Sequence, residues 1–143
     1  MKAEKVKKLP RGIRNCNPGN LVISKIPWNG KVPKKDNTDG HFEQFISMEY
    51  GIRAMIMDLR GDIMKDGLNT IEKLISSYAP DNENDTVAYI KVVAKRTGIK
   101  FNEKMIADKS TIFKLVEAIS FHENGGAFLT NEMIERAWEM LSV

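Results

Sequence analysis

The chain has 143 residues, of which 42% are hydrophobic and 29% charged, and its formal net charge is +3. This length and balance are typical of one soluble globular domain and leave no room for a second. A single cysteine and two histidines exclude an internal disulfide and a four-ligand structural zinc site. The basic residues are spread along the chain, which argues against a dedicated nucleic-acid-binding protein.

The N-terminus is rich in lysine, and no apolar segment follows it. The sequence therefore shows no secretory signal, and no apolar run approaches the about 20 residues that span a bilayer. We expect a protein made in the cytoplasm without a signal peptide and without membrane insertion. Residues 1–9 are expected to form a loosely ordered basic arm, and residues 10–143 a single domain.

Repeated prolines and glycines follow between residues 11 and 40, with short apolar runs around Leu21 and Trp28. This composition predicts loops and hairpins rather than helix. Residues 41–45 alternate between polar and apolar side chains, which predicts a short strand.

The rest of the chain has helical periodicity. Apolar residues recur at spacings of three and four between Ile52 and Ile63, with Ser47 as the expected N-cap and Gly67 as the end. Further helices are predicted over residues 71–78, 86–97, 111–123 and 131–141, with caps expected at Asn69, Asp85, Ser110 and Thr130. The fold class is therefore mostly α with a small β region near the N-terminus.

Glu123 is the most informative candidate for chemistry. It lies four residues after Ile119 and seven after Val116, so it points with the buried face of its helix. Partial burial and the negative end of the helix dipole both disfavour the anion, which predicts a raised pKa and a general acid. The following Gly125-Gly126 lets another chain approach the carboxyl group. The alternative is an ordinary surface glutamate in a frayed last turn.

A second cluster lies in the early loops and combines Asn17, Asn20 and Trp28 with Asp39 at its rim. Asparagine, proline and glycine are ordinary turn residues, so a set of hairpin turns explains Pro18 and Gly19, but it explains the asparagines and Trp28 less well. Amide side chains beside an aromatic platform also hold sugar rings, so Asn17, Asn20 and Trp28 are candidate groove residues. Asp39 is either a second carboxylate or the acceptor of an Asx turn.

A third cluster, residues 79–86, alternates acidic and amide side chains. A calcium loop is unlikely there, because the glycine that such a loop needs at its sixth position is replaced by Thr86. Glu83 and Tyr89 are not needed as helix caps, and we expect both to face the cleft.

The motifs RGIRNCNPGNL, PWNG, TDGHFEQF, SMEYGIRAM and AISFHENGG together resemble, in this order, a group of small phage and prophage proteins. That group is often labelled as virion structural proteins and is related to the lysozyme-like peptidoglycan hydrolases. The resemblance covers residues 11–126, and the chain departs from it at Cys16, where a third asparagine is expected.

The parts also resemble those of bacterial glucosaminidases and lytic transglycosylases, with the helix that carries the glutamate placed last. We therefore hypothesise a lysozyme-like domain in circularly permuted order. The resemblance implies cleavage of the glycan strand of peptidoglycan, of muramidase or lytic transglycosylase type, without metal or organic cofactor. Glu123 and Asp39 would be the catalytic residues, and the substrate-binding residues would be Asn17, Asn20, Trp28, Glu83 and Tyr89. The alternative is a non-catalytic virion structural or wall-binding module of the same fold.

Overall fold

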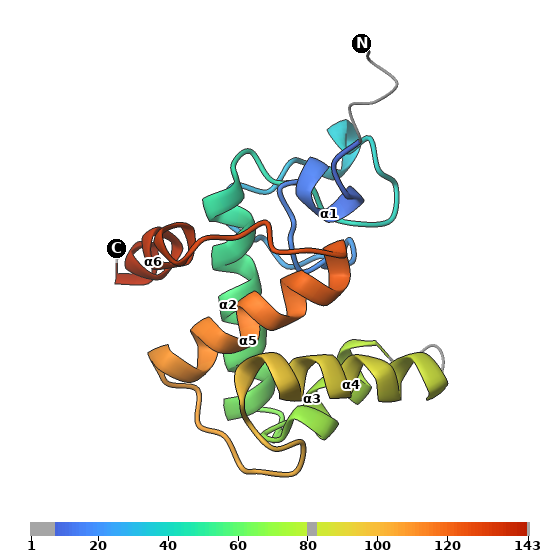
Figure 1. The fold of residues 1–143 in the computed structure, drawn as a ribbon. Helices are drawn as coiled ribbons and strands as arrows, with labels where there is room; N and C mark the ends of the chain where they lie inside the picture. Colours follow the sequence, from blue (N-terminus) through green and yellow to red (C-terminus); the bar gives the residue numbers. More distant parts are fainter. Residues whose placement is uncertain (1–7, 80–82, 143) are drawn as a thin grey trace.

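A computed structural model describes residues 8–79 and 83–142, and these residues are mostly α-helical (Figure 1). The α-helices are α1 (Arg11–Arg14), α2 (Met48–Met64), α3 (Ile71–Tyr78), α4 (Glu83–Thr97), α5 (Lys109–Asn124) and α6 (Asn131–Glu139). Two short 3-10 turns, η2 (Lys34–Asp36) and η3 (Met140–Ser142), complete the regular elements.

The hydrophobic core is built around α2 and α5, which cross in the middle of the molecule (Figure 1). Both helices present an unbroken apolar face, and Leu59 of α2 and Leu115 of α5 are fully buried. Helix α6 packs on α2, and α4 packs on α3 and α5. Burial of these aliphatic side chains is the main force that holds the helices in place.

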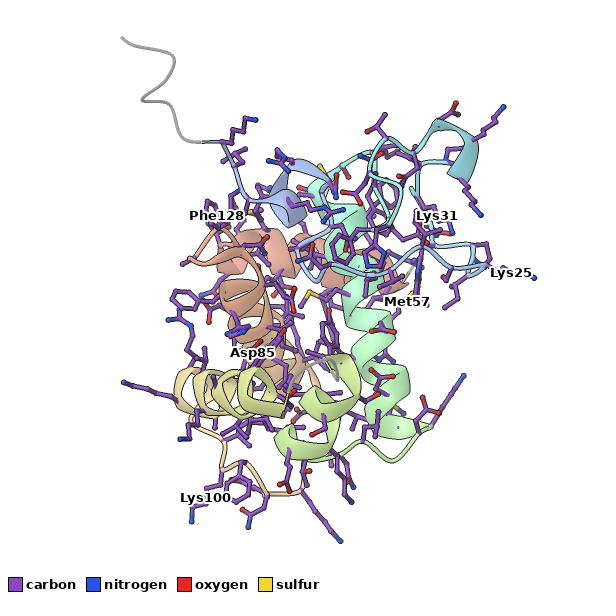
Figure 2. The ribbon with its side chains drawn as sticks, turned by 90° about the vertical axis from the view of Figure 1, so that its right-hand side faces the viewer. Lys25, Lys31, Met57, Asp85, Lys100 and Phe128 are labelled. Carbon is purple, nitrogen blue, oxygen red and sulfur yellow. The ribbon has the colours of Figure 1, made fainter. Side chains whose placement is uncertain are left out.

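The N-terminal loops form one end of the molecule and contact the last turn of α5 through α1. The loop that holds Lys100, below α3 and α4, lies at the opposite end (Figure 2). The site described below lies where the loops meet the helices.

Several expected helix ends are confirmed. Ser47 caps α2 by accepting a hydrogen bond from the Tyr50 N–H group, and Thr130 caps α6 in the same way. Helix α3 covers residues 71–78 as expected. Gly125 ends α5 in the left-handed conformation, with φ of 67°.

Other expectations about caps are wrong. Thr70 rather than Asn69 caps α3, because the Thr70 hydroxyl reaches the N–H group of Lys73. Asp108 rather than Ser110 caps α5, which therefore begins two residues earlier than predicted. Helix α4 begins at residue 83, ahead of the cap expected at Asp85. At α3 and α5 a neighbouring polar residue competes for the cap, and sequence alone does not decide between them.

The expected small β region is wrong as well. Within the described residues the early loops hold only two isolated antiparallel bridges, Val22 with Phe42 and Lys31 with Phe45. Side chains take the place of a ladder here: Asp39 accepts from the Phe42 N–H group at 2.8 Å. The segment 11–14 also forms the short helix α1, where only loop was expected.

No helix among the described residues is long and apolar enough to cross a bilayer. Residues 1–7, for which a loose arm was expected, lie outside the described part.

Candidate functional site

Glu123 lies in the last turn of α5, and its half-buried carboxyl group contacts two distant parts of the chain. The side-chain nitrogen of Asn20 donates to its Oε1 at 2.7 Å. The hydroxyl of Tyr89 donates to its Oε2 at 2.8 Å. One carboxyl group therefore joins the early loops, α4 and α5, and each of its oxygens is oriented by its own donor.

Asn20 reaches Glu123 because its backbone is left-handed, with φ of 51°. Asparagine tolerates this conformation better than most residues. The turn is closed by a backbone bond from Asn20 to Asn17 at 3.0 Å. Asn17 is fully buried and donates to the carbonyl oxygens of Leu21 and Glu43. Asn17 thus supports the turn that carries Asn20 and does not line the groove.

Two further bonds fix the loop against the helices. The amide nitrogen of Asn124 donates to the Pro18 carbonyl at 2.9 Å, and the Tyr78 hydroxyl donates to the Gly19 carbonyl at 2.5 Å. A Cβ atom on Gly19 would lie 2.5 Å from that hydroxyl, so glycine is needed for this close approach. The motif of residues 17–20 therefore serves as the connection between the loops, α3 and α5.

Tyr89 is buried and stacks on the ring of His122 at 3.8 Å between centroids. Burial and the neighbouring charge of Glu123 raise the pKa of the Tyr89 hydroxyl well above its ordinary value. Tyr89 therefore stays protonated and remains a hydrogen-bond donor to the carboxylate. Tyr89 was predicted to face the cleft; it contacts Glu123 through its hydroxyl, but its side chain is buried and does not belong to the groove lining described below.

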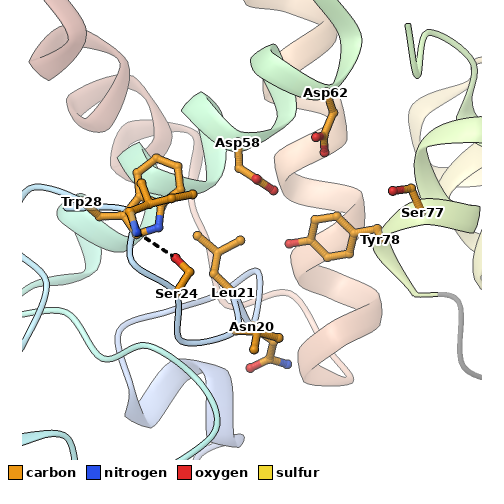
Figure 3. A pocket seen from close by; sticks show the side chains of 10 residues that line it. Asn20, Leu21, Ser24, Trp28, Asp58, Asp62, Ser77 and Tyr78 are labelled. Carbon is orange, nitrogen blue, oxygen red and sulfur yellow. Dashed lines mark hydrogen bonds between the residues drawn. The ribbon is translucent and has the colours of Figure 1, made fainter. Parts of the chain in front are cut away.

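A groove of about 310 Å³ opens beside Asn20, between the early loops and the face formed by α2 and α3 (Figure 3). Its lining combines aromatic, apolar and acidic side chains: Asn20, Leu21, Val22, Ser24, Ile26, Trp28, Asp58, Asp62, Ser77 and Tyr78. Trp28 lies at this groove, as expected for an aromatic platform. A groove of this size takes a sugar ring or a similar group.

Sequence reasoning missed Asp58 and Asp62. Burial raises the pKa of both carboxyl groups, and the charges of Asp58 and Asp66 help to raise that of Asp62 to about 7. The sequence does show that Asp58 and Asp62 are four residues apart, which places both on one face of a helix. It does not show which part of the chain lies opposite that face, so the spacing alone could not predict a groove.

Asp39 is engaged elsewhere. It forms a two-pronged ion pair with Arg11 at 2.7 and 2.8 Å and accepts from the Asn15 side chain at 2.9 Å. The guanidinium of Arg11 holds the pKa of this carboxyl well below its usual range. Asp39 does not line the groove, and its bonds are those of the Asx-turn alternative. The side chain of Glu83, also predicted to face the cleft, lies outside the described part.

No group of three or more His, Cys, Asp or Glu side chains within residues 8–79 and 83–142 is arranged to hold a metal ion. The donors that surround Glu123 are amide and hydroxyl groups, whose role is to orient a carboxyl group. The chemistry that the arrangement supports is proton transfer and hydrogen bonding to a polar ligand.

No family model matches the chain. It is similar to Protein P5 of Pseudoalteromonas phage PM2, with 36% identity over 132 residues. The similarity covers 90% of this chain and 80% of the phage protein.

Proposed function

The chain belongs to the family of Protein P5 of Pseudoalteromonas phage PM2, and we propose that it cleaves the glycan strand of peptidoglycan with Glu123 as the general acid. The observation that carries this proposal is the setting of Glu123. Its carboxyl group is half-buried and held through both oxygens, and one of its two donors, Asn20, lines the groove that contains Trp28. The resemblance of the sequence motifs to those of lysozyme-like hydrolases supports the same proposal, and with it a lysozyme-like fold in circularly permuted order.

The two donors suit a carboxyl group that must gain and lose a proton. Each carboxylate oxygen has two lone pairs, so one oxygen can carry the proton while Asn20 and Tyr89 keep their bonds. When the proton moves to the glycosidic oxygen, Glu123 becomes an anion. Both hydrogen bonds are then charge-assisted and stronger. The site therefore stabilises the state in which the bond is breaking more than the bound substrate.

Two product types follow from two possible nucleophiles. Attack of water on the cationic sugar gives a reducing end. Attack of the 6-hydroxyl of the same sugar gives an anhydro end, with Glu123 acting as acid and then as base. The net charge of +3 is compatible with a polyanionic wall as substrate. Release on lysis or transport in a virion would both bring the enzyme to that wall.

The test compares Glu123→Gln with Glu117→Gln. Glu117 lies on the same helix but pairs with Arg96 at the surface, at 2.7 Å, so its replacement controls for charge loss on α5. Purified cell walls are incubated with each variant, and loss of turbidity and mass spectra of the released muropeptides are recorded. We expect Glu123→Gln to lose about 100-fold or more in rate, while Glu117→Gln keeps its rate.

Undiminished lysis by Glu123→Gln would assign the chemistry to another group. Absence of lysis by the parent protein, with retention on sedimented walls, would favour the non-catalytic wall-binding module. The masses of the released fragments identify the bond cut and distinguish a reducing end from an anhydro end.

A further inference from the structure

Two carboxyl groups on α2 open on the groove without a hydrogen-bond or ion-pair partner in the described part of the chain. Asp58 and Asp62 are both half-buried, and Figure 3 shows them on one face of the helix, pointing toward Tyr78 and Leu21. No ion pair among the described residues includes either of them. Arg60 lies between them in sequence but extends over the ring of Trp138 instead.

This arrangement costs the folded protein stability. Like charges four residues apart on a helix repel each other, and partial burial removes water from both. An asparagine or a serine would fill the same positions without repulsion. Unpaired acidic groups that face a cavity, and that the fold does not need, are typical of functional sites.

Tyr78 and Asn20 connect this pair with Glu123. Burial first, and then the charges of Glu123, Asp58 and Asp62, raise the pKa of Tyr78 well above its ordinary value. All three carboxyl groups therefore influence the same hydroxyl. Asn20, which holds Glu123, lines the groove together with both aspartates.

We propose that Asp58 and Asp62 supply the second carboxylate of the site and stabilise the positive charge that develops on the sugar ring as the glycosidic bond breaks. This inference depends on the proposed glycan cleavage. The sequence had offered Asp39 for the same task, but its ion pair with Arg11 already neutralises that carboxylate.

Glu123 gives its proton to the glycosidic oxygen, the C–O bond breaks with its electron pair going to that oxygen, and an alcohol leaves. The ring becomes an oxocarbenium ion, whose charge faces the ionised member of the aspartate pair. Water or the 6-hydroxyl then forms the new bond at the same carbon, and its proton goes to Glu123. The aspartates exchange no proton and form no bond in this sequence.

The experiment compares the parent protein with Asp58→Asn, Asp62→Asn, the double variant and Asp36→Asn. Asp36 is an exposed aspartate in η2, away from the groove, and serves as the control. Soluble peptidoglycan strands are the substrate. Initial rates give kcat and KM separately, and thermal unfolding followed by circular dichroism gives Tm.

We expect the double variant to lose about 100-fold in kcat, with KM changed by less than about threefold, because the charge acts only as the bond breaks. Its Tm is expected to equal or exceed that of the parent, since the repulsion is removed. Asp36→Asn should match the parent in both measurements. A merely structural role would instead lower Tm, and a binding role would act on KM.

A double variant that keeps its kcat would overturn the inference while leaving the role of Glu123 intact. A double variant that unfolds would also overturn it, because the fold would then need the pair. If the parent cleaves strands and Glu123→Gln cleaves them equally well, the proposed function itself fails, whatever the aspartate variants do.

Discussion

Replacing Asp62 by asparagine should stabilise the protein at alkaline pH and leave its stability in acid unchanged. The pKa of Asp62 rises from 3.8 to about 7 on folding, because the side chain is partly buried and lies near the charges of Asp58 and Asp66. Between these two values the folded state holds a proton that the unfolded chain has lost. The free energy of unfolding therefore falls as pH rises from about 4 to about 7, and the loss is complete above that range.

The size of the effect follows from the shift. About three pKa units correspond to about 4 kcal/mol. Asp62 is only half-buried, so water screens much of this cost, and we expect about 1–2 kcal/mol. Asparagine has nearly the same shape and no charge, so Asp62→Asn should recover this amount at about pH 8.

Urea unfolding of the parent and of Asp62→Asn, followed by circular dichroism, measures the difference at about pH 4 and about pH 8. The other titratable groups are the same in both proteins, so their contributions cancel to first order when the two free energies of unfolding are subtracted. This prediction would be refuted if the two proteins differed equally in free energy of unfolding at both pH values. It would also be refuted if Asp62→Asn were less stable than the parent at about pH 8, because Asp62 would then not be an unpaired carboxyl group with a raised pKa.

Two further predictions concern stability. Gly51→Ala should prevent stable folding, with a loss of about 3 kcal/mol or more, because its Cβ atom would lie 1.7 Å from the Cys16 carbonyl oxygen. Gly61→Ala on the same helix meets no atom within 4 Å and should gain about 0.5–1 kcal/mol in urea unfolding; equal effects of the two would contradict this packing. Asp39→Asn should lower the free energy of unfolding by about 1–3 kcal/mol at neutral pH. Because the pKa of Asp39 is lower in the folded protein than in the unfolded chain, its carboxylate stabilises the fold above the unfolded pKa. The cost of the substitution should therefore shrink as pH falls below about 4. Loss of lytic rate in a folded Asp39→Asn variant would instead support the catalytic role predicted from the sequence.

Helix positions could be predicted from the sequence because the apolar period is a local property that burial enforces. The stripe from Ile52 to Ile63 and the stop at Gly125 depend on nothing beyond their own segments. The early loops were harder to predict. Their structure is set by side chains such as Asp39 and Asn17, which bond backbone groups and replace the β ladder that the alternation of residues 41–45 suggested.

The candidate site was predictable in part. The period of α5 places Glu123 on the inner face of its helix, and the resemblance joins it to the asparagine motif. No local pattern shows that Asn20 meets Glu123 across 103 positions or that Tyr89 lies beneath it. Cys16, where the resemblance led us to expect asparagine, has a φ of 53°, a conformation that asparagine adopts more readily than cysteine. Nothing in the structure explains the cysteine at this position.

Several features that cost stability lie at the groove. Asn20 holds a left-handed backbone, and its Oδ1 atom is buried without accepting a bond from any described residue. Such an unpaired oxygen costs about 1–3 kcal/mol, and it follows from turning the amide nitrogen toward Glu123. Asp58 and Asp62 add unpaired charge on the facing wall. A module selected only for stability or for packing into an assembly would gain by losing each of these features. Their concentration at one groove is what the proposed chemistry at Glu123 would require.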